Sequence, residues 1–405
     1  MDFIVLSLIK AGLIAFVLLT TLAYLQWVER KVLAHIQLRP GPRRVGPHGL
    51  LQPLADVIKL LTKEGYVPSH VNKPFYFLAP FLGVVLALLA ISVIPFGPEI
   101  EIAGVKTQMG MTDLSVGLLF ILGLTSVGVY GVALGGWASN NKYALLGGLR
   151  SSAQMISYEL PMALALASPL LLANTLSFRE IVGTQEGFYF GFLPRWAIFQ
   201  MPFPQVVAFI LYVITAFAET NRVPFDLPEA ENELVAGFHT EYSSLKFAAF
   251  FMAEYANMIT VTSIATLLFL GGWHPPFPRE LGSDFIPPLL FAAGGAVMLF
   301  HGVTQPRGKW DNITLPVFGL IFLGIAALFA GCAVLPMLEP VRQILLPVFW
   351  FAGKTGILLF LFIWVRGTLP RFRYDQLMRF AWTFLFPVAV VNLLATSFFV
   401  AVFSN

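Results

Sequence analysis

Long apolar segments repeat along almost the whole chain and are separated by short polar stretches. One helix needs about 20 apolar residues to cross a bilayer. The pattern predicts ten transmembrane helices, at residues 3–26, 77–95, 114–137, 154–173, 204–220, 247–271, 285–303, 314–338, 344–365 and 381–403. The expected fold is therefore all-α, a polytopic membrane helix bundle that forms one integral membrane domain over residues 1–405, with interfacial helices in its loops.

Lysine and arginine are distributed unevenly between the loops on the two sides of the predicted bundle. The loop after the first span is the richest, and the loops after the third, fifth, seventh and ninth spans hold most of the remainder. Short loops rich in these residues stay in the cytoplasm. The distribution therefore predicts a multi-pass protein with both termini on the outer face and residues 27–76 in the cytoplasm.

Composition agrees with this class and argues against several functions. Hydrophobic residues make up 57% of the chain and charged residues only 12%, about half the charged share of a soluble protein. No basic patch remains beyond what the topology explains, so no nucleic-acid partner is expected. Cys332 is the only cysteine, and among the histidines only His301 approaches a span. We therefore expect no redox centre and no cofactor bound by this chain.

The loop at residues 27–76 combines a turn with an amphipathic helix. Prolines and glycines exclude a helix between residues 40 and 47. From residue 49 to 64, apolar residues recur at helical spacing, as in a helix that lies in the membrane interface. One interpretation is simple anchoring of a surface helix, and the other is the mouth of a cavity for an amphipathic ligand. The polar groups of such a mouth would be Arg30, Arg39 and Asp56.

The loop at residues 219–246 is acidic, although the other loops on its side are basic. Asp226 and Glu229 have the spacing of a capping box, which predicts a short helix. Glu229 and Glu233 would share one face of it, while Glu231 would face elsewhere. A solvated acidic surface is the simplest interpretation, but a functional loop better explains the exception. The spacing matches no calcium or zinc pattern, so no metal site is predicted.

Three glutamates lie inside predicted spans or at their ends: Glu159, Glu219 and Glu254. An ionised carboxylate at bilayer depth costs roughly 2.5–3.5 kcal/mol even on the mildest insertion scale. All three are expected in the half of the membrane nearest the acidic loop. Each could be a neutral group that bonds neighbouring helices. Three together, beside a run of acids, favour a proton-accessible path.

These blocks resemble a family of membrane-arm proteins in bacterial NADH:quinone oxidoreductase (respiratory complex I), the counterpart of the first mitochondrially encoded subunit of NADH dehydrogenase. The resemblance rests on Glu29–Glu64, Ser157–Pro161, Ala218–Tyr255, Gly353–Thr355 and Arg371–Met378. It implies a protein of the bacterial inner membrane that joins the membrane arm to the hydrophilic arm and walls a quinone chamber. Quinone would be the substrate, and FMN and iron–sulfur clusters would belong to partner subunits.

The resemblance also implies roles for single residues, none of them catalytic in this chain alone. Chamber and loop residues would be Glu29, Arg30, Arg39, Asp56, Arg222, Phe225, Asp226, Glu229, Glu231 and Glu233. A proton-coupling chain would begin with Glu159, Glu219 and Glu254. The partners would be the subunits of the hydrophilic arm that complete the quinone site and the other subunits of the membrane arm.

Two features depart from the family pattern. Family members usually have about eight spans, whereas residues 279–348 here resemble an inserted segment with two extra helices, at 285–303 and 314–338. An even number of added spans leaves the orientation of the helix with Lys354 unchanged. The second departure is Phe238, where many bacterial relatives have tyrosine, so a role that needs a hydroxyl there is in doubt.

Other functions fit parts of the same pattern. A membrane subunit of a proton-pumping hydrogenase, or of an oxidoreductase with another electron donor, shares the general architecture. A stand-alone cation/proton antiporter and a purely structural anchor are further alternatives. The proteins that co-purify with the chain would distinguish the NADH:quinone oxidoreductase from a hydrogenase or an oxidoreductase with another electron donor. Transport by the isolated chain would identify an antiporter.

Overall fold

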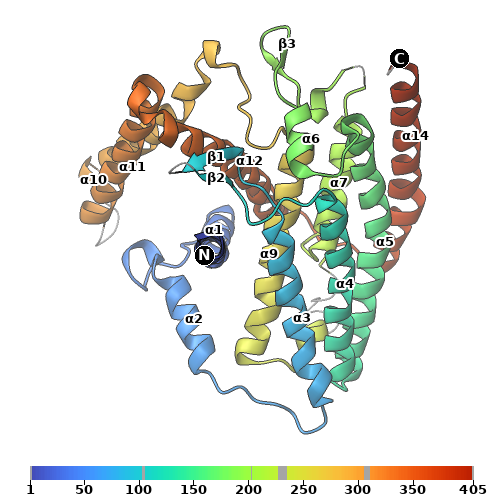
Figure 1. Cartoon of the computed structure of the whole chain (residues 1–405). Helices are drawn as coiled ribbons and strands as arrows, with labels where there is room; N and C mark the ends of the chain where they lie inside the picture. Colours follow the sequence, from blue (N-terminus) through green and yellow to red (C-terminus); the bar gives the residue numbers. More distant parts are fainter. Residues whose placement is uncertain (1, 103–104, 202, 227–234, 305–310, 404–405) are drawn as a thin grey trace.

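The computed structural model describes the whole chain except residues 1, 103–104, 202, 227–234, 305–310 and 404–405 (Figure 1). All ten predicted spans are confirmed as helices. Nine helices of the described part are long and apolar enough to cross a membrane. They are α1 (Asp2–Ile36), α3 (Lys73–Ser92), α4 (Gly117–Ala138), α5 (Lys142–Ala173), α9 (Ser244–Phe269), α10 (Ile286–Thr304), α11 (Asp311–Val334), α12 (Glu339–Thr368) and α13 (Tyr374–Phe380) continued through a π-helical turn into α14 (Phe386–Phe403).

The one predicted span that is not among these nine is the fifth, at 204–220, which corresponds to α7, Val206–Glu219, and has only 14 residues. At ~1.5 Å per residue it is about 21 Å long, shorter than the hydrocarbon layer of a bilayer, which is about 30 Å thick. Glu219, the last residue of α7, lies inside the molecule rather than at its surface, with 5% of its surface exposed.

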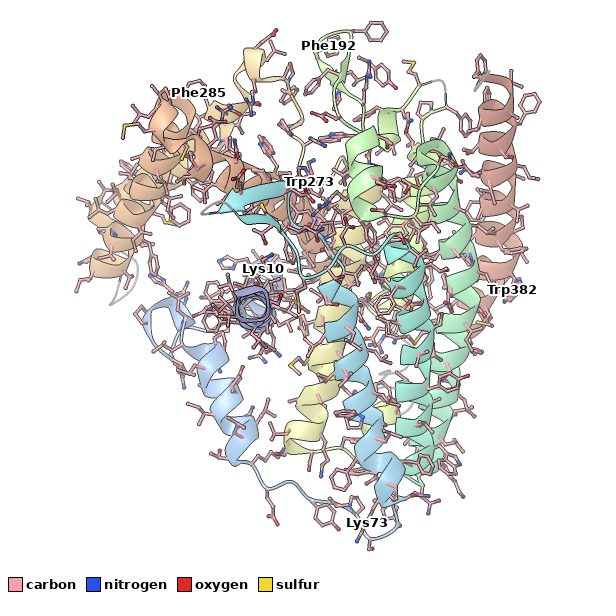
Figure 2. All side chains as sticks on the ribbon, viewed as in Figure 1. Lys10, Lys73, Phe192, Trp273, Phe285 and Trp382 are labelled. Carbon is pink, nitrogen blue, oxygen red and sulfur yellow. The ribbon has the colours of Figure 1, made fainter. Side chains whose placement is uncertain are left out.

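Short elements distinguish the two ends of the bundle. At one end, the strand end, lie the antiparallel pairs β1 (Glu99–Ile102) with β2 (Val105–Gln108) and β3 (Phe188–Tyr189) with β4 (Leu193–Pro194), together with α6 (Phe178–Thr184). The other end, the acidic-loop end, holds residues 63–72 and the described parts of 220–243, which Tyr76 joins by donating to the carbonyl of Glu241. Figure 2 shows Phe192 at the first end and Lys73 at the second.

The core of the bundle is built by helices that approach each other closely at small residues. Where α4 meets α5, a Cβ on Gly136 would lie 2.5 Å from the carbonyl oxygen of Ala144, so only glycine fits. Small residues of this kind allow close helix packing in membranes. At the centre stands α9, in which every residue from Thr260 to Phe269 is buried. The helices around α9 therefore form a rigid frame for polar groups.

Helix α1 does not run parallel to that frame. Figure 1 shows it almost end-on, whereas α3, α5 and α9 stand upright. Its 35 residues span about 52 Å, so a strong tilt fits its length. Near one end, Lys10 donates to Thr107 and to the carbonyl of Gln108, 3.0 Å away. Near the other end, α1 continues past its predicted limit at residue 26 and carries Glu29 and Arg30.

Helix α2, Gln52–Thr62, follows α1 after a turn that is helical only at Pro47–Gly49, and matches the surface helix expected at 49–64. The segment expected as an insertion, 279–348, contains α10 and α11, which pair with each other at one side of the molecule (Figure 1). They meet α12 through the aromatic rings of Phe291, Phe329 and Phe349, whose centroids are 5.6–5.9 Å apart.

Candidate functional site

A cluster of buried charges joins four parts of the chain that are far apart in sequence. Arg222, just after α7, pairs with Glu29 of α1 (Nη1–Oε1 3.0 Å) and with Glu254 of α9 (Nε–Oε1 2.6 Å). Arg366 of α12 is a second partner of Glu29. Tyr255 donates its hydroxyl to Glu29 Oε2 at 2.9 Å, and its ring lies 4.4 Å from the guanidinium of Arg222.

The cluster balances its own charge, because two carboxylates face two guanidinium groups. Glu29 and Arg222 are almost completely buried, with 2% and 5% of their surface exposed. Removing one partner of such a buried pair costs about 3–5 kcal/mol, since the other charge is then left uncompensated. We call Glu29, Arg222, Glu254 and Arg366 the charge cluster.

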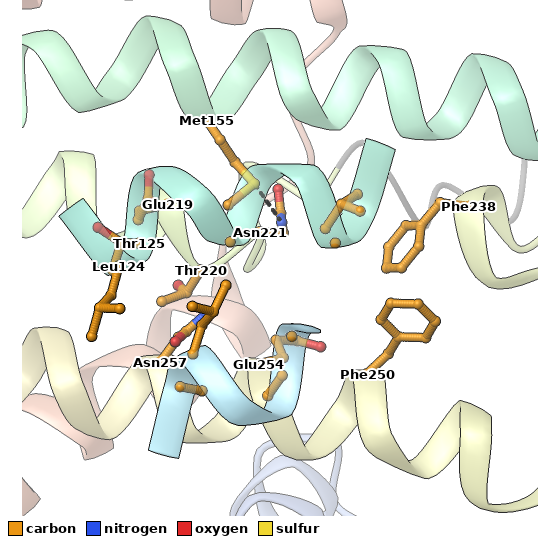
Figure 3. A pocket seen from close by; sticks show the side chains of 17 residues that line it. Leu124, Thr125, Met155, Glu219, Thr220, Asn221, Phe238, Phe250, Glu254 and Asn257 are labelled. Atoms are coloured by element: carbon orange, nitrogen blue, oxygen red, sulfur yellow. Dashed lines mark hydrogen bonds between the residues drawn. The ribbon is translucent and has the colours of Figure 1, made fainter. Parts of the chain in front are cut away.

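Next to the charge cluster lies a small cavity of about 70 Å³, whose largely apolar wall includes several polar side chains. Figure 3 shows Glu219 and Glu254 on its wall with Asn257 and Thr125, and the rings of Phe238 and Phe250 at one side. This volume has room for a few water molecules, and the polar side chains on the wall offer them partners. Two of the three predicted coupling carboxylates therefore share one cavity, and Glu254 also belongs to the charge cluster.

The third carboxylate, Glu159, approaches the same region from α5. It accepts a hydrogen bond from Ser126 of α4 and is close enough to act electrostatically on Glu219. Phe238 takes no polar part in the wall, because its ring meets Phe250 edge-on at 5.1 Å between centroids. The three carboxylates thus lie in neighbouring parts of α5, α7 and α9.

At the surface, Arg30 and Asp56 form an ion pair of 2.7 Å that ties α1 to α2. Gln52 donates to the other oxygen of Asp56 at 3.0 Å. Arg39 does not join them, since its Nε donates to Gln37 and its side chain is exposed. Arg30 follows Glu29 directly, so one turn of α1 holds both the surface pair and the buried charge cluster.

The described start of the acidic loop is packed into the core. Phe225 is buried beside Tyr158 and Phe372, with ring centroids 5.4 and 5.6 Å away. Asp226 pairs with Arg371 at 2.7 Å. Gln154 of α5 donates to the carbonyls of Ala218 and Phe225, at 2.9 and 2.8 Å. Glu229, Glu231, Glu233 and the short helix predicted there lie outside the described residues.

Some residues of the site were not singled out from the sequence. Arg366 and Arg371 follow a predicted span and have the position of ordinary membrane-anchoring arginines. Their partners, Glu29 and Asp226, lie 337 and 145 residues away. Tyr255 directly follows Glu254 and Gln154 lies five residues before Glu159, and this closeness to the predicted carboxylates was the one signal that could have marked them.

A second buried charge lies at the strand end. Lys354 of α12 donates to the carbonyls of Leu270, Gly272 and His274, at 2.6, 3.0 and 2.6 Å. The three N–H donors of an ammonium group match these three acceptors. The ammonium also lies 4.1 Å from the ring centroid of Trp196. No carboxylate is needed, because the end of α9 itself favours a cation.

The turn around Lys354 requires glycine. Gly271 and Gly272 have φ of 70° and 52°, a region that side chains disfavour, and a Cβ on Gly271 would lie 2.2 Å from Trp196. Burial lowers the pKa of the His274 ring, although Glu186 opposes this. His274 and Glu186 line a cavity of about 450 Å³ at the strand end, which also reaches Arg342 and Asp284, paired at 2.7 Å.

Within the described residues, no group of three or more His, Cys, Asp or Glu side chains could hold a metal ion. Comparison with known proteins agrees with the motifs in the loops. The family model described as NADH dehydrogenase matches residues 9–397. The chain belongs to this family. The charge cluster, the cavity beside it and Lys354 all lie inside the matched range.

Several relatives within the family are similar over almost their whole length. The NADH-quinone oxidoreductase H subunit 1 of Solibacter usitatus (strain Ellin6076) is 67% identical over 99% of this chain and 98% of its own. The NADH-quinone oxidoreductase H subunit 2 of Koribacter versatilis (strain Ellin345) is 49% identical over 98% of each. The H subunit 1 of the same enzyme from Geobacter metallireducens (strain ATCC 53774 / DSM 7210 / GS-15) is 44% identical over 97% and 96%. The resemblance based on the loop blocks is thereby confirmed.

Proposed function

We propose that this chain is the membrane subunit of a proton-pumping NADH:quinone oxidoreductase. It forms the entrance and part of the wall of a quinone chamber and couples quinone reduction to proton translocation. The names of its relatives support the enzyme class. The acidic-loop end would face the cytoplasm and contact the hydrophilic arm, in agreement with the distribution of lysine and arginine.

One observation carries the coupling part of the proposal: a series of ion pairs, joined through the neighbouring residues Glu29 and Arg30 of α1, leads from the surface helix to the buried cavity. Asp56 of α2 pairs with Arg30, and the neighbouring Glu29 pairs with Arg222. Arg222 pairs with Glu254, which lines the cavity together with Glu219. A change of charge near α2 is therefore linked to Glu254 through three ion pairs, Asp56–Arg30, Glu29–Arg222 and Arg222–Glu254.

The mechanism follows from this line. Electrons would reach quinone from the FMN and iron–sulfur clusters of partner subunits, and reduction to quinol takes up protons as well as electrons. A change of charge beside α1 would shift Arg222 between Glu29 and Glu254. If Glu254 lost the guanidinium it would take up a proton, because a buried carboxylate that loses its cation is costly, whereas Glu29 would keep Arg366 as a partner.

The energies are adequate in scale. Moving one charge against 100 mV costs about 2.3 kcal/mol, and an uncompensated charge in a buried pair costs about 3–5 kcal/mol. A change in the partner of Arg222 is therefore enough to bias one proton transfer. Glu254 would exchange its proton with Glu219 through water in the cavity, and Glu159 would extend the path toward α4.

Labelling with a photoreactive quinone analogue tests the chamber. In the assembled complex, the analogue should label residues 29–64 or 220–226 of this chain, and excess quinone should prevent it. Labelling confined to other subunits would contradict the proposal. Co-purification with a flavin- and NADH-binding module separates this function from that of a hydrogenase-type membrane protein, which would co-purify with a nickel-containing module.

A further inference from the structure

Helix α2 buries little apolar surface against the rest of the described chain. Pro53 is its only buried residue, and four of its apolar side chains are about half exposed: Leu54 57%, Val57 46%, Ile58 51% and Leu61 58%. Apolar packing, which normally fixes the position of a helix, is therefore weak here. Polar contacts at single points therefore help to hold α2 in place.

Those contacts hold α2 at both ends and near its middle. At its last turn, Ser244 donates to the carbonyls of Leu60 and Lys63, at 2.8 and 3.0 Å. In its second turn, Asp56 pairs with Arg30. Just before it begins, His48 Nε2 and Thr314 Oγ1 of α11 are 2.7 Å apart. The first two contacts come from α9 and α1, and the third comes from the α10–α11 pair.

The backbone conformation of the turn that carries His48 is constrained by positive φ angles and by close packing. His48 has φ 52°, and Gly46 and Gly49 have φ 70° and 77°. Positive φ is uncommon for a residue other than glycine. Gly49 packs so closely on Pro42 that a Cβ would lie 2.3 Å from its carbonyl oxygen. The His48 side chain therefore moves with this turn, and α2 begins only a few residues later.

The other partner, Thr314, belongs to a rigid pair of helices. Where α10 and α11 cross, a Cβ on Gly295 would lie 2.8 Å from the carbonyl oxygen of Gly319. A Cβ on Gly302 would lie 2.5 Å from Pro316, two residues from Thr314. At the strand end, Asp284 before α10 pairs with Arg342 of α12 at 2.7 Å. The pair is thus fastened to the bundle at one end and reaches the turn before α2 at the other.

We propose that the α10–α11 pair is a brace that positions α2 at the quinone entrance, and that His48 and Thr314 are the positioning residues through which it acts. The inference rests on the proposed function, because it concerns the entrance of that chamber. The brace explains how a weakly packed helix can keep Asp56 beside Arg30. It also predicts that its loss affects quinones with long tails more than short ones, since a long tail extends past the entrance while the ring reacts.

The test uses the assembled complex with Thr314→Val, which removes the hydroxyl at nearly constant size. Thr304→Val is the matched control, because Thr304 lies exposed on α10 and donates within its own helix to Phe300. His48→Asn is the second variant, since asparagine tolerates positive φ but is too short to reach Thr314. Thr314→Ser, which keeps the hydroxyl, should behave as the unsubstituted complex.

Two readouts are measured: hydrogen exchange of residues 45–62, and KM for the native quinone against KM for a short-tailed analogue. Thr314→Val and His48→Asn should increase the exchange and raise KM for the native quinone about two- to tenfold, the range expected for one hydrogen bond. KM for the analogue and both kcat values should not change. Unchanged exchange would overturn the brace, and increased exchange with unchanged KM would overturn its role at the entrance. Failure of the chamber itself is distinguished by absent quinone-analogue labelling in the unsubstituted complex.

Discussion

The two ends of the bundle hold buried charge in different ways. In the charge cluster, side chains neutralise side chains, and Arg222 has two carboxylate partners on different helices. At the strand end, Lys354 is held by backbone carbonyls of a turn that only glycine can form. Side-chain pairs can exchange partners, whereas backbone acceptors stay in place. The difference suggests that the charge cluster serves switching and the Lys354 site serves structure.

The largest expected effect comes from Arg222→Leu. Glu29 and Glu254 would lose a shared partner, at a cost of about 3–5 kcal/mol. We expect little assembled complex and no quinone-dependent NADH oxidation, measured by native electrophoresis and activity staining. Arg222→Lys should be less severe, because one ammonium can pair with one carboxylate but lacks the fork that contacts both. Normal assembly and activity of the leucine variant would contradict the role of the charge cluster.

Lys354→Met should lower stability without changing coupling. Each buried carbonyl left without a donor costs about 1–3 kcal/mol, so the thermal midpoint of the complex should fall. Protons moved per NADH oxidised, measured on the complex that does assemble, should match the unsubstituted value. A reduced ratio would show that the Lys354 site takes part in coupling, and the contrast between the two ends would be lost.

Arg30→Gln should have the opposite profile. Its pair with Asp56 is partly exposed, with 44% of the arginine side chain accessible, and such pairs contribute about 0.2–1 kcal/mol. Stability should hardly change, while KM for the native quinone should rise because α2 loses one of its contacts. A clear fall in the thermal midpoint would show that this pair, like the Lys354 site, serves stability instead.

The smallest expected effect concerns pH and His274. Burial lowers its pKa below the ordinary value of 6.5, so the folded state favours the neutral ring. The stability that comes from keeping the His274 ring neutral is present above pH 6.5. It is lost as the pH falls through that value toward the lower folded pKa, because the unfolded chain then takes up a proton first. The thermal midpoint should therefore drop between pH 7.5 and 5.5 by less in His274→Gln than in the unsubstituted complex. Equal drops in the two proteins would show that His274 does not contribute to the pH dependence of stability.

The sequence predicted the helices well because apolar length determines which segments cross a membrane. It placed the end of α1 and the start of α5 too far inside, at residues 26 and 154 rather than 36 and 142. Charged residues at those ends suggested loops, but Glu29 is neutralised by Arg222 and Arg366 and so can remain in a buried helix.

The sequence predicted which residues belong to the site, but it did not predict which of them pair with each other. The three intramembrane glutamates were visible as exceptions in apolar segments, and the structure brings them together. The partners of Glu29 come from residues 193 and 337 positions away, and no local pattern encodes such distances. Arg39 illustrates the reverse case: it belongs to a polar block by sequence, yet it extends away from the contacts of Arg30 and Asp56.

The most direct test of the central claim is proton translocation by the complex with Glu219→Gln in sealed vesicles. Glu219 lines the cavity without belonging to the charge cluster, so its loss removes an exchangeable proton and leaves the ion pairs intact. Glu180→Gln, an exposed carboxylate at the strand end bonded to Thr175, is the matched control. The account predicts that NADH-driven translocation falls about tenfold or more in Glu219→Gln and is unchanged in the control. Equal translocation by the two variants would contradict it.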